Sequence, residues 1–134
     1  MADSGINMYD AKDVTLTVDG VVIQGFQDAD MITYSFKEEQ VRTSVDAQGV
    51  PSLAKNNNHL GNIVINLSGN SKSHKFLNNL ANTRKVFPIV IKSDLEKVSS
   101  TQCIIAKPAD GAFGKDTPKR TYTVEALSME VTAL

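Results

Sequence analysis

The stretch Asn62–Ser68 (Asn-Ile-Val-Ile-Asn-Leu-Ser) decides the fold class of this chain of 134 residues. Its largest apolar side chains stand at every second position, at Ile63, Ile65 and Leu67. Successive side chains of a strand point to opposite faces, so this spacing predicts a strand with one buried row and one polar row. We expect the apolar row to face the core and the polar row to face away from it.

Several other segments repeat this period of two. An Asp19-Gly20 pair joins Val14–Val18 to Val21–Ile23, which predicts a β-hairpin because glycine accepts the positive φ of a tight turn. The remaining predicted strands are Ile32–Phe36, Val41–Val45, Val86–Lys92, Val98–Ala106 and Arg120–Val131. In the last of these the apolar row changes parity at Leu127, which predicts a bulge or a bend.

One segment between the strands has the spacing of a helix. Its apolar face carries Phe76, Leu77, Leu80 and Ala81. Ser71 or Ser73 can cap the start of this helix. We expect Phe76 and Leu80 to be buried, which contributes about 1.5–3 kcal/mol for each side chain. The sequence therefore predicts a mainly β chain with one helix, of a length typical of a single domain.

Two stretches show neither period, residues 46–60 and residues 107–118. The first joins two predicted strands that a short turn could have joined, and the second contains two glycines and two prolines. Irregular loops of this length are uncommon in compact domains unless they bind a partner or are disordered. We interpret both stretches as long loops, and residues 46–60 as a candidate binding loop.

Charge is strongly segregated along the chain. Residues 1–46 hold nine acids and three bases, residues 47–93 hold six bases and no acid, and residues 94–134 hold six acids and five bases. The segment sums of −6, +6 and −1 give the total of −1. The acidic and basic segments can pair within one molecule, or the acidic surface of one copy can meet the basic surface of the next in a head-to-tail contact.

No set of residues with catalytic or metal-binding spacing is present. The chain has one cysteine, Cys103, and two histidines, His59 and His74, and a Ser-x-x-Lys match at Ser52 and Lys55 lacks its companion motifs. We therefore predict no enzymatic activity and no cofactor. The first residues lack the features of a signal peptide, and no apolar run is long enough to cross a bilayer, so we expect a soluble chain without membrane insertion.

The basic segment 47–93 leaves a second function open. Its six cations could contact phosphates in a small β-barrel that binds nucleic acid. Aromatic side chains for base stacking are scarce in this segment, and Phe76 and Phe87 have the spacing of core residues. Nucleic-acid binding therefore remains an alternative to a structural role.

The order of the predicted elements adds a resemblance to a known family. Gly25-Phe26 and Met31–Lys37 follow the first hairpin, and the chain continues with Glu39–Arg42, Asp46–Val50, Asn58–Leu67, a serine-rich helix start and Phe87–Lys92. This order, over most of residues 12–132, resembles the tail tube proteins of contractile-tailed bacteriophages, a family of phage structural proteins related to the tubes of bacteriocins and type VI secretion.

The resemblance implies a fold and an assembly. It implies an antiparallel β-sandwich-like or barrel-like domain, residues 13–134, with one flanking helix and an N-terminal arm, residues 1–12. Six copies would form a ring whose sheets join into an inner β-barrel, and rings would stack into a hollow tail tube through which phage DNA is ejected. The implied partners are further copies of the chain, a tail sheath protein, and baseplate and tail-terminator proteins. The implied location is the virion, after assembly in the host bacterial cytoplasm.

The resemblance also assigns surfaces. Loop 46–60 would contact a neighbouring subunit or ring, with the N-terminal arm and loop 107–118 as further contacts. The candidate inter-subunit and inter-ring residues are Val50, Pro51, Leu53, Lys55 and Asn57. The candidate lumen-facing residues are Thr33, Ser35, Gln40, Ser44, Asn62, Asn66 and Ser68. A neutral or acidic lining would let DNA slide, so Lys37 and Arg42 on the same rows require nearby acids such as Glu39.

Overall fold

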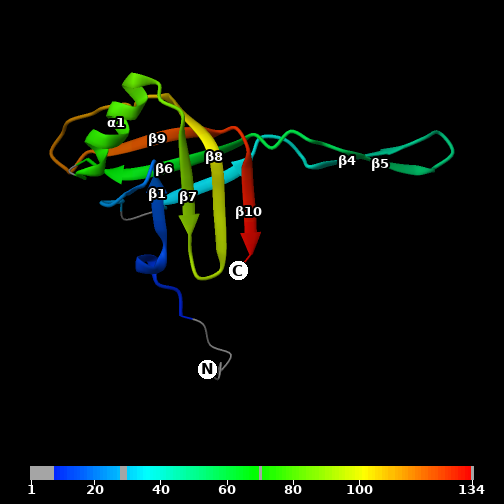
Figure 1. Ribbon diagram of the computed structural model, residues 1–134, viewed down its shortest axis with the longest axis horizontal. Coiled ribbons are helices and arrows are strands. Elements are labelled where there is room, and N and C mark those ends of the chain that lie inside the picture. The colour runs from blue at the N-terminus through cyan, green and yellow to red at the C-terminus, as the bar shows by residue number, and fades with distance from the viewer. Residues whose placement is uncertain (1–7, 28–29, 70, 134) are drawn as a thin grey trace.

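The computed structural model describes residues 8–27, 30–69 and 71–133, and all elements named below lie within them (Figure 1). In chain order they are η1 (Ala11–Asp13), β1 (Thr15–Val18), β2 (Val21–Val22), β3 (Ile32–Phe36), β4 (Val41–Val45), β5 (Pro51–Lys55), β6 (Gly61–Ser68), α1 (Ser73–Thr83), β7 (Phe87–Lys92), β8 (Glu96–Lys107), β9 (Lys119–Ala126) and β10 (Met129–Ala133). The mainly β fold with one flanking helix is confirmed. All of the paired strands are antiparallel.

One sheet contains every strand except β4 and β5. Its order is β2-β1-β7-β8-β9-β6-β3, and β10 also pairs with β8. The first half of β8 pairs with β7 and β10, whereas its second half pairs with β9. In Figure 1, β7, β8 and β10 run across β6 and β9. The sheet therefore folds over at β8 into two layers that enclose the core, as in orthogonally packed sheets.

Strand β8 changes its buried side where the sheet folds over. Its buried residues are Val98 and Ser100 in the first half, then Cys103 and Ile105 in the second. Alternation would have buried the residue at 102, so the strand turns over between Ser100 and Cys103. The ladder between β7 and β8 shifts register at the same place.

The backbone also bends between β9 and β10, beside the point where β8 turns over. This confirms the bend predicted at Leu127. Ala126 at the end of β9 and Met129 at the start of β10 are both buried, while Leu127 is 42% exposed. The buried Ser100 hydroxyl donates to the Gln102 carbonyl at 3.0 Å and accepts from the Ser128 N–H at 3.4 Å. These bonds satisfy polar groups that the bend removes from the regular ladder.

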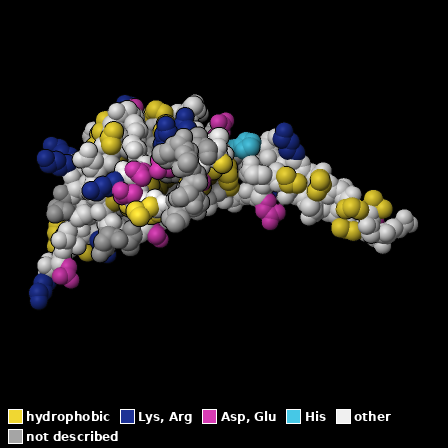
Figure 2. Space-filling view, turned by 90° about the horizontal axis from the view of Figure 1, so that it is seen from below, with side chains coloured by type: hydrophobic (Ala, Val, Ile, Leu, Met, Phe, Trp, Pro, Cys, Tyr) yellow, Lys and Arg dark blue, Asp and Glu magenta, His cyan; other side chains and the backbone are white. Residues whose placement is uncertain are grey.

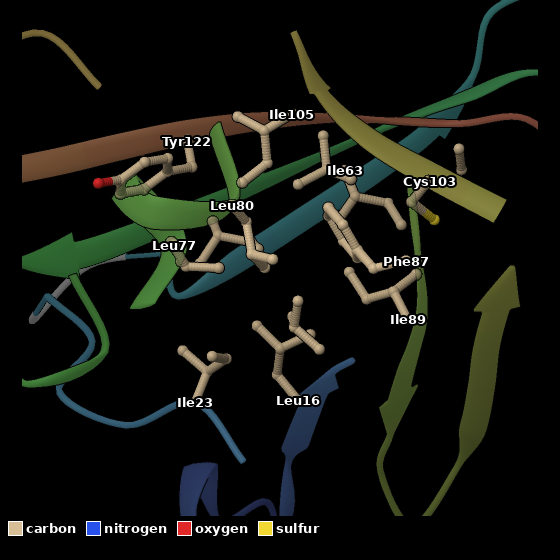
Figure 3. Close-up of a cluster of buried hydrophobic side chains, with 14 of the residues drawn as sticks. Leu16, Ile23, Ile63, Leu77, Leu80, Phe87, Ile89, Cys103, Ile105 and Tyr122 are labelled. Carbon is tan, nitrogen blue, oxygen red and sulfur yellow. The ribbon is translucent and has the colours of Figure 1, made fainter. Parts of the chain in front are cut away.

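The core lies between the two layers, and α1 packs against it (Figure 3). Ile63, Ile65 and Leu67 are each 0% exposed, so the apolar row of the opening sequence faces the core as predicted. The close-up shows side chains from strands and helix converging: Leu16, Ile23, Ile63, Leu77, Leu80, Phe87, Ile89, Cys103, Ile105 and Tyr122. The predicted hairpin is also present, with Asp19 and Gly20 at φ values of 50° and 81°.

The helix start differs from the prediction of a serine N-cap. Lys72 occupies the N-cap position and forms no side-chain cap. The Ser73 hydroxyl instead accepts the Gln24 N–H at 2.9 Å, and the Ser71 hydroxyl donates to the Gln24 carbonyl. The two serines therefore tie the helix start to the connection between β2 and β3.

The buried face of the helix also needs one correction. Leu77 and Leu80 are 0% and 4% exposed, whereas Phe76 is only partly buried at the edge of the core. The burial expected for Leu80 is confirmed, but Leu77 replaces Phe76 as the main anchor. Among the described residues, no helix has both the length and the apolar character needed to span a membrane.

A partly buried hydrogen bond joins α1 to β9. The Tyr122 hydroxyl lies 2.7 Å from His74 Nδ1, and burial raises the pKa of Tyr122 to about 12. Burial, and then the charge of Arg120, lowers the pKa of His74 below its usual 6.5. The unfolded chain therefore binds a proton at His74 more strongly than the folded chain does. The free energy of unfolding should rise with pH up to about 6.5 and then level off.

We expect His74→Gln to remove part of this pH dependence. Urea unfolding at pH 5.5 and pH 7.5, on monomeric protein, measures the difference in free energy of unfolding for each variant. Tyr122→Phe is the matched control, because it removes only the hydroxyl and should cost about 1 kcal/mol at pH 7.5. If the free energy of unfolding of His74→Gln changes between pH 5.5 and pH 7.5 by as much as that of the parent, His74 is not a source of the pH dependence.

Candidate assembly surfaces

Strands β4 and β5 form a hairpin that projects from the body, hereafter the arm, residues 41–55 (Figure 1). All ten of its strand residues are exposed. The expectation that residues 46–60 form an irregular loop is therefore wrong, because Pro51–Lys55 pairs with β4. Residues 108–118, by contrast, contain no helix or strand, in agreement with the loop predicted at 107–118.

The turn of the arm explains why this hairpin forms without a core beneath it. Gly49 adopts a φ of 84°, which favours glycine. The Asp46 side chain accepts from the Gln48 and Val50 N–H groups at 2.9 Å each. An aspartate that bonds to the backbone ahead of it stabilises a turn locally.

The base of the arm is held by amide side chains. Asn56 and Asn58 each donate to Glu38 Oε2 at 3.1 Å, and these bonds, more than the nearby Arg42, lower the pKa of Glu38. The Gln40 amide donates to the Asn58 carbonyl at 3.3 Å. The asparagine run therefore links the segment that enters the arm to the segment that leaves it, at the point where both join the body.

The two faces of the arm differ in composition. Cross-strand register places Val41, Thr43, Val45, Pro51, Leu53 and Lys55 on one side, hereafter the apolar face, and Arg42, Ser44, Ser52 and Ala54 on the other. On the apolar face Val45 and Leu53 are 66% and 73% exposed. Figure 2 shows the resulting row of hydrophobic side chains along the arm. Four of the predicted contact residues, Val50, Pro51, Leu53 and Lys55, lie on the arm, and the fifth, Asn57, is exposed at its base.

A second surface is the side of β3, β6 and β9 that points away from the core, hereafter the polar face. Five predicted lumen residues lie there: Thr33, Ser35, Asn62, Asn66 and Ser68. The Thr121 hydroxyl donates to Asn66 Oδ1 at 2.9 Å, and Asn66 donates to the Asp30 carbonyl at 3.0 Å. Gln40 and Ser44 were predicted to share this surface, but Ser44 lies on the arm and Gln40 lies at its base, because β4 pairs with β5 and not with β3.

The charges on these surfaces are largely paired. Lys37 Nζ lies 2.9 Å from Glu125 Oε1 on β9, and Arg42 lies 3.6 Å from Glu38 on the arm. Nearby acids therefore compensate both cations, as required, but the acids are Glu125 and Glu38 and not Glu39. The β9 residues Thr121, Thr123 and Glu125 complete the polar face, and the alternation around Tyr122 could have identified them. Lys119 stands at the far end of this row.

The second layer of the sheet ends in strands without a neighbour on one side. Its order is β8-β9-β6-β3, and β3 is the last strand of that path. At the other end β8 pairs with β7 only as far as Cys103, so the stretch 104–107 has no partner strand on that side among the described residues. Edge strands of this kind present backbone groups that another chain can bond.

The segregated charges are mostly not paired with each other inside the molecule. Among the ion pairs of the described residues, only Lys85–Asp19, at 2.7 Å, joins the basic segment to the acidic first segment. Lys72 lies at the N-cap of α1 and Lys75 on its first turn, and the helix packs on the core side of β9. The cations of the helix and the polar face are therefore on opposite sides of the same sheet layer.

The described residues contain no cluster of three or more His, Cys, Asp or Glu side chains that could hold a metal ion. Cys103 is free and 0% exposed, and burial raises the pKa of its thiol. The candidate functional surfaces of the described residues are therefore the arm, the polar face and the strand edges.

Several solved structures are similar to this chain in fold. No family model and no curated protein sequence matches the chain. Among solved structures, a protein of the native gene transfer agent virion aligns with a TM-score of 0.67 and 14% identity, covering 95% of this chain and 99% of the other. The tube-terminating cap of the anti-feeding prophage aligns with a TM-score of 0.61 and 12% identity over the whole of both chains.

A third similar structure belongs to an extracellular contractile injection system. It is a chain of the sheath–tube complex in the extended state, with a TM-score of 0.58, 15% identity, and coverage of 93% of this chain and 91% of the other. At identities this low the likeness concerns the fold. The chain therefore has a tail-tube-like fold, shared with tube and tube-terminating proteins of contractile systems and phage-like particles.

Proposed function

We propose that this chain is a structural subunit that assembles with identical copies into six-membered rings, and that the rings stack into a hollow tail tube. The observation that carries the proposal is the layer β8-β9-β6-β3, which has a strand edge at each end and a polar face turned away from the core. The tail-tube-like fold supports the same assignment.

The strand directions favour closure into a ring. Three antiparallel steps separate β8 from β3, so these two edge strands run in opposite directions. When β3 of one copy lies beside β8 of the next, the pair is again antiparallel, and every further copy repeats the same contact. A repeated contact between two different patches closes into a ring when its rotation allows. The joined layers would form one inner β-barrel without strand edges.

The polar face would then line the lumen. Hydroxyl and amide groups dominate it, and Lys37 is neutralised by Glu125. Such a lining gives phosphates few fixed cations to bind, so duplex DNA could pass without being held. The cations of α1 would face outward, where a sheath protein would surround the tube. Baseplate and terminator proteins would contact the ends of the tube, and the assembled particle would be a phage tail or a related injection system built in the bacterial cytoplasm.

The nucleic-acid-binding alternative has weaker support. The bases of segment 47–93 are distributed over the arm, the helix and the end of β7, at Lys55, Lys72, Lys75, Arg84, Lys85 and Lys92. A groove that tracks a nucleic-acid backbone would place cations and exposed aromatic rings together.

Negative-stain microscopy of the concentrated purified protein tests the proposal directly. Rings with six-fold symmetry, or regular hollow tubes, are the expected result. A strict monomer at high concentration that binds DNA tightly and in a salt-sensitive manner would reject the tube and favour the alternative.

The lumen assignment has its own test. We expect tubes of Thr33→Lys/Asn62→Lys to retain short linear duplex DNA roughly tenfold better than parent tubes at low salt, because each added lysine contacts a phosphate. Duplexes blocked at both ends by a bulky protein should not be retained, since they cannot thread the lumen. Filter binding with both DNA forms measures this.

The matched control carries the same substitutions on the exposed side of the helix. Asn79→Lys/Asn82→Lys should bind open and blocked duplexes equally. If the Thr33 and Asn62 variant also binds both forms equally, the polar face lies on the outside of the tube.

A further inference from the structure

A groove lies beside β3, where the folded sheet does not close on itself. It has a volume of about 670 Å³, and its apolar lining includes Val14, Met31, Ile32, Tyr34, Leu95 and Val98. A second cavity of about 410 Å³ continues past Val14 and Leu95 toward Met8 and Tyr9. Leu95 borders both cavities and is 68% exposed. The groove is thus an apolar trough between the edge of β3 and the turn that joins β7 to β8.

The charged side chains that line this groove are all acidic. Asp30 and Glu96 lie in the first cavity, and Asp10, Asp13 and Asp94 lie in the second. Asp94, burial and Asp10 together raise the pKa of Asp13, which reflects how closely these carboxylates approach each other. A cationic occupant would relieve this repulsion.

The apolar face of the arm has the complementary properties. Its valines and leucine have no core beneath them, and Lys55 is the one charged side chain among its strand positions. A two-stranded hairpin alone in water is marginally stable, and an exposed apolar row on such a hairpin indicates a partner surface. At about 3.3 Å per residue, five-residue strands give the apolar face a length of about 17 Å.

The arm cannot reach the groove of its own molecule. Figure 1 shows the arm leading away from the body, whereas the lining of the groove comes from η1, β3 and the turn between β7 and β8 within the body. The asparagine and Gln40 bonds at its base hold it in this direction. Contact between arm and groove therefore requires two molecules.

We infer that the groove beside β3 receives the apolar face of the arm of a second copy, with Leu53 in the trough and Lys55 toward the acidic rim. This inference rests on the proposed assembly and specifies its docking site. Arm and groove are different patches of one chain, so the contact is heterologous and each copy both donates an arm and accepts one. Such a contact propagates along a stack.

Disulfide cross-linking within assembled tubes tests the inference. We expect the double variant Leu53→Cys/Leu95→Cys, after mild oxidation, to give a ladder of dimers, trimers and higher species on a non-reducing gel. Each single variant should give little dimer, because its new cysteine faces a position without a thiol. The native Cys103 is buried and should not contribute. The control pair Leu53→Cys/Asn79→Cys, with the second cysteine on the exposed face of α1, should give no ladder.

A labelling experiment shows whether the groove is covered in the tube, and the cross-link shows whether the arm is what covers it. The thiol of Leu95→Cys should react with a maleimide at least tenfold more slowly in tubes than in monomers. Equal rates would mean that the groove stays empty in the tube, and slow labelling without a cross-link to position 53 would mean that another segment or molecule fills it. Either result overturns the inference while leaving tubes seen by microscopy intact. Absence of tubes from the parent protein would instead reject the proposed function.

Discussion

Removal of Arg42–Ala54, with Val41 joined to Lys55 through an Asn-Gly turn, is expected to abolish tubes while leaving the domain folded. Val41 and Lys55 are direct cross-strand partners, so a two-residue turn can close the shortened hairpin. Every strand residue of the arm is exposed, so its loss uncovers no core. The melting temperature should therefore stay within about 3 °C of the parent. Circular dichroism measures folding, and negative-stain microscopy measures assembly.

A paired substitution separates the role of the apolar face from that of the arm as a whole. Val45→Ser/Leu53→Ser should remove tubes as the deletion does, because both substitutions would remove apolar side chains from the face that is proposed to contact the neighbour. Ser44→Ala/Ser52→Ala, on the opposite face, should leave tube formation intact even though it removes their 2.8 Å hydrogen bond. Tubes of parental length from the deletion would exclude the arm from assembly altogether.

Leu77→Ala should produce the largest loss of stability among single substitutions of the helix, about 2–5 kcal/mol. Leu77 is 0% exposed and lies with Leu80 in the core that Figure 3 displays. Truncation there removes buried methyl groups and leaves a cavity that rigid neighbours on two sheet layers cannot fill. Urea unfolding of the monomer, with the slope compared between variants, measures the change in free energy of unfolding.

Two neighbouring positions serve as controls for Leu77. Phe76→Ala should cost less than about 2 kcal/mol, because the ring is only partly buried. Asn79→Ala, on the exposed side, should change stability by less than about 0.5 kcal/mol. A loss for Phe76→Ala that exceeds the loss for Leu77→Ala would show that the helix is seated differently.

The sheet was predictable from alternation because most strands bury one row and expose the other. Strand β6 is the clearest case, with Ile63, Ile65 and Leu67 buried and Asn62, Val64 and Asn66 on the other, partly exposed side. The bend after β9 was predictable as well, since Ala126 and Met129 cannot both be buried in a regular strand. The serine cap was not, because Ser71 and Ser73 bond to Gln24, which is distant in sequence.

Half of the arm was predicted, because the alternation of Val41–Val45 indicated β4 as a strand even though no core lies beneath it. Strand β5 was missed, because its residues show no clear alternation of apolar and polar side chains. Pro51 at its first position and the asparagines after Lys55 are typical of loops. The local turn signals at Asp46 and Gly49 could have indicated the hairpin. For the same reason Gln40 and Ser44 were assigned to the surface of β3, which β4 does not join.

The groove beside β3 could not have been found from the sequence. Its lining comes from η1, β3 and the β7–β8 region, which are brought together only by the order of strands in the sheet. Residues such as Leu95 are isolated in sequence and carry no pattern of their own. Leu53 and Lys55 were named as contact residues from the sequence, and that role remains a prediction, whereas no sequence pattern pointed to the surface that would receive them.

The fold-over of β8 has a mechanical consequence. One continuous backbone belongs to both layers, so a force applied to the layer β8-β9-β6-β3, which would line the channel of the proposed tube, is transmitted to the other layer along covalent bonds and not through side-chain packing alone. In a particle driven by contraction of an outer sleeve, each subunit would therefore resist shear between its inner and outer walls. Softening this strand at Ser100 should yield tubes that still assemble but break under load, which force measurements on single tubes can detect.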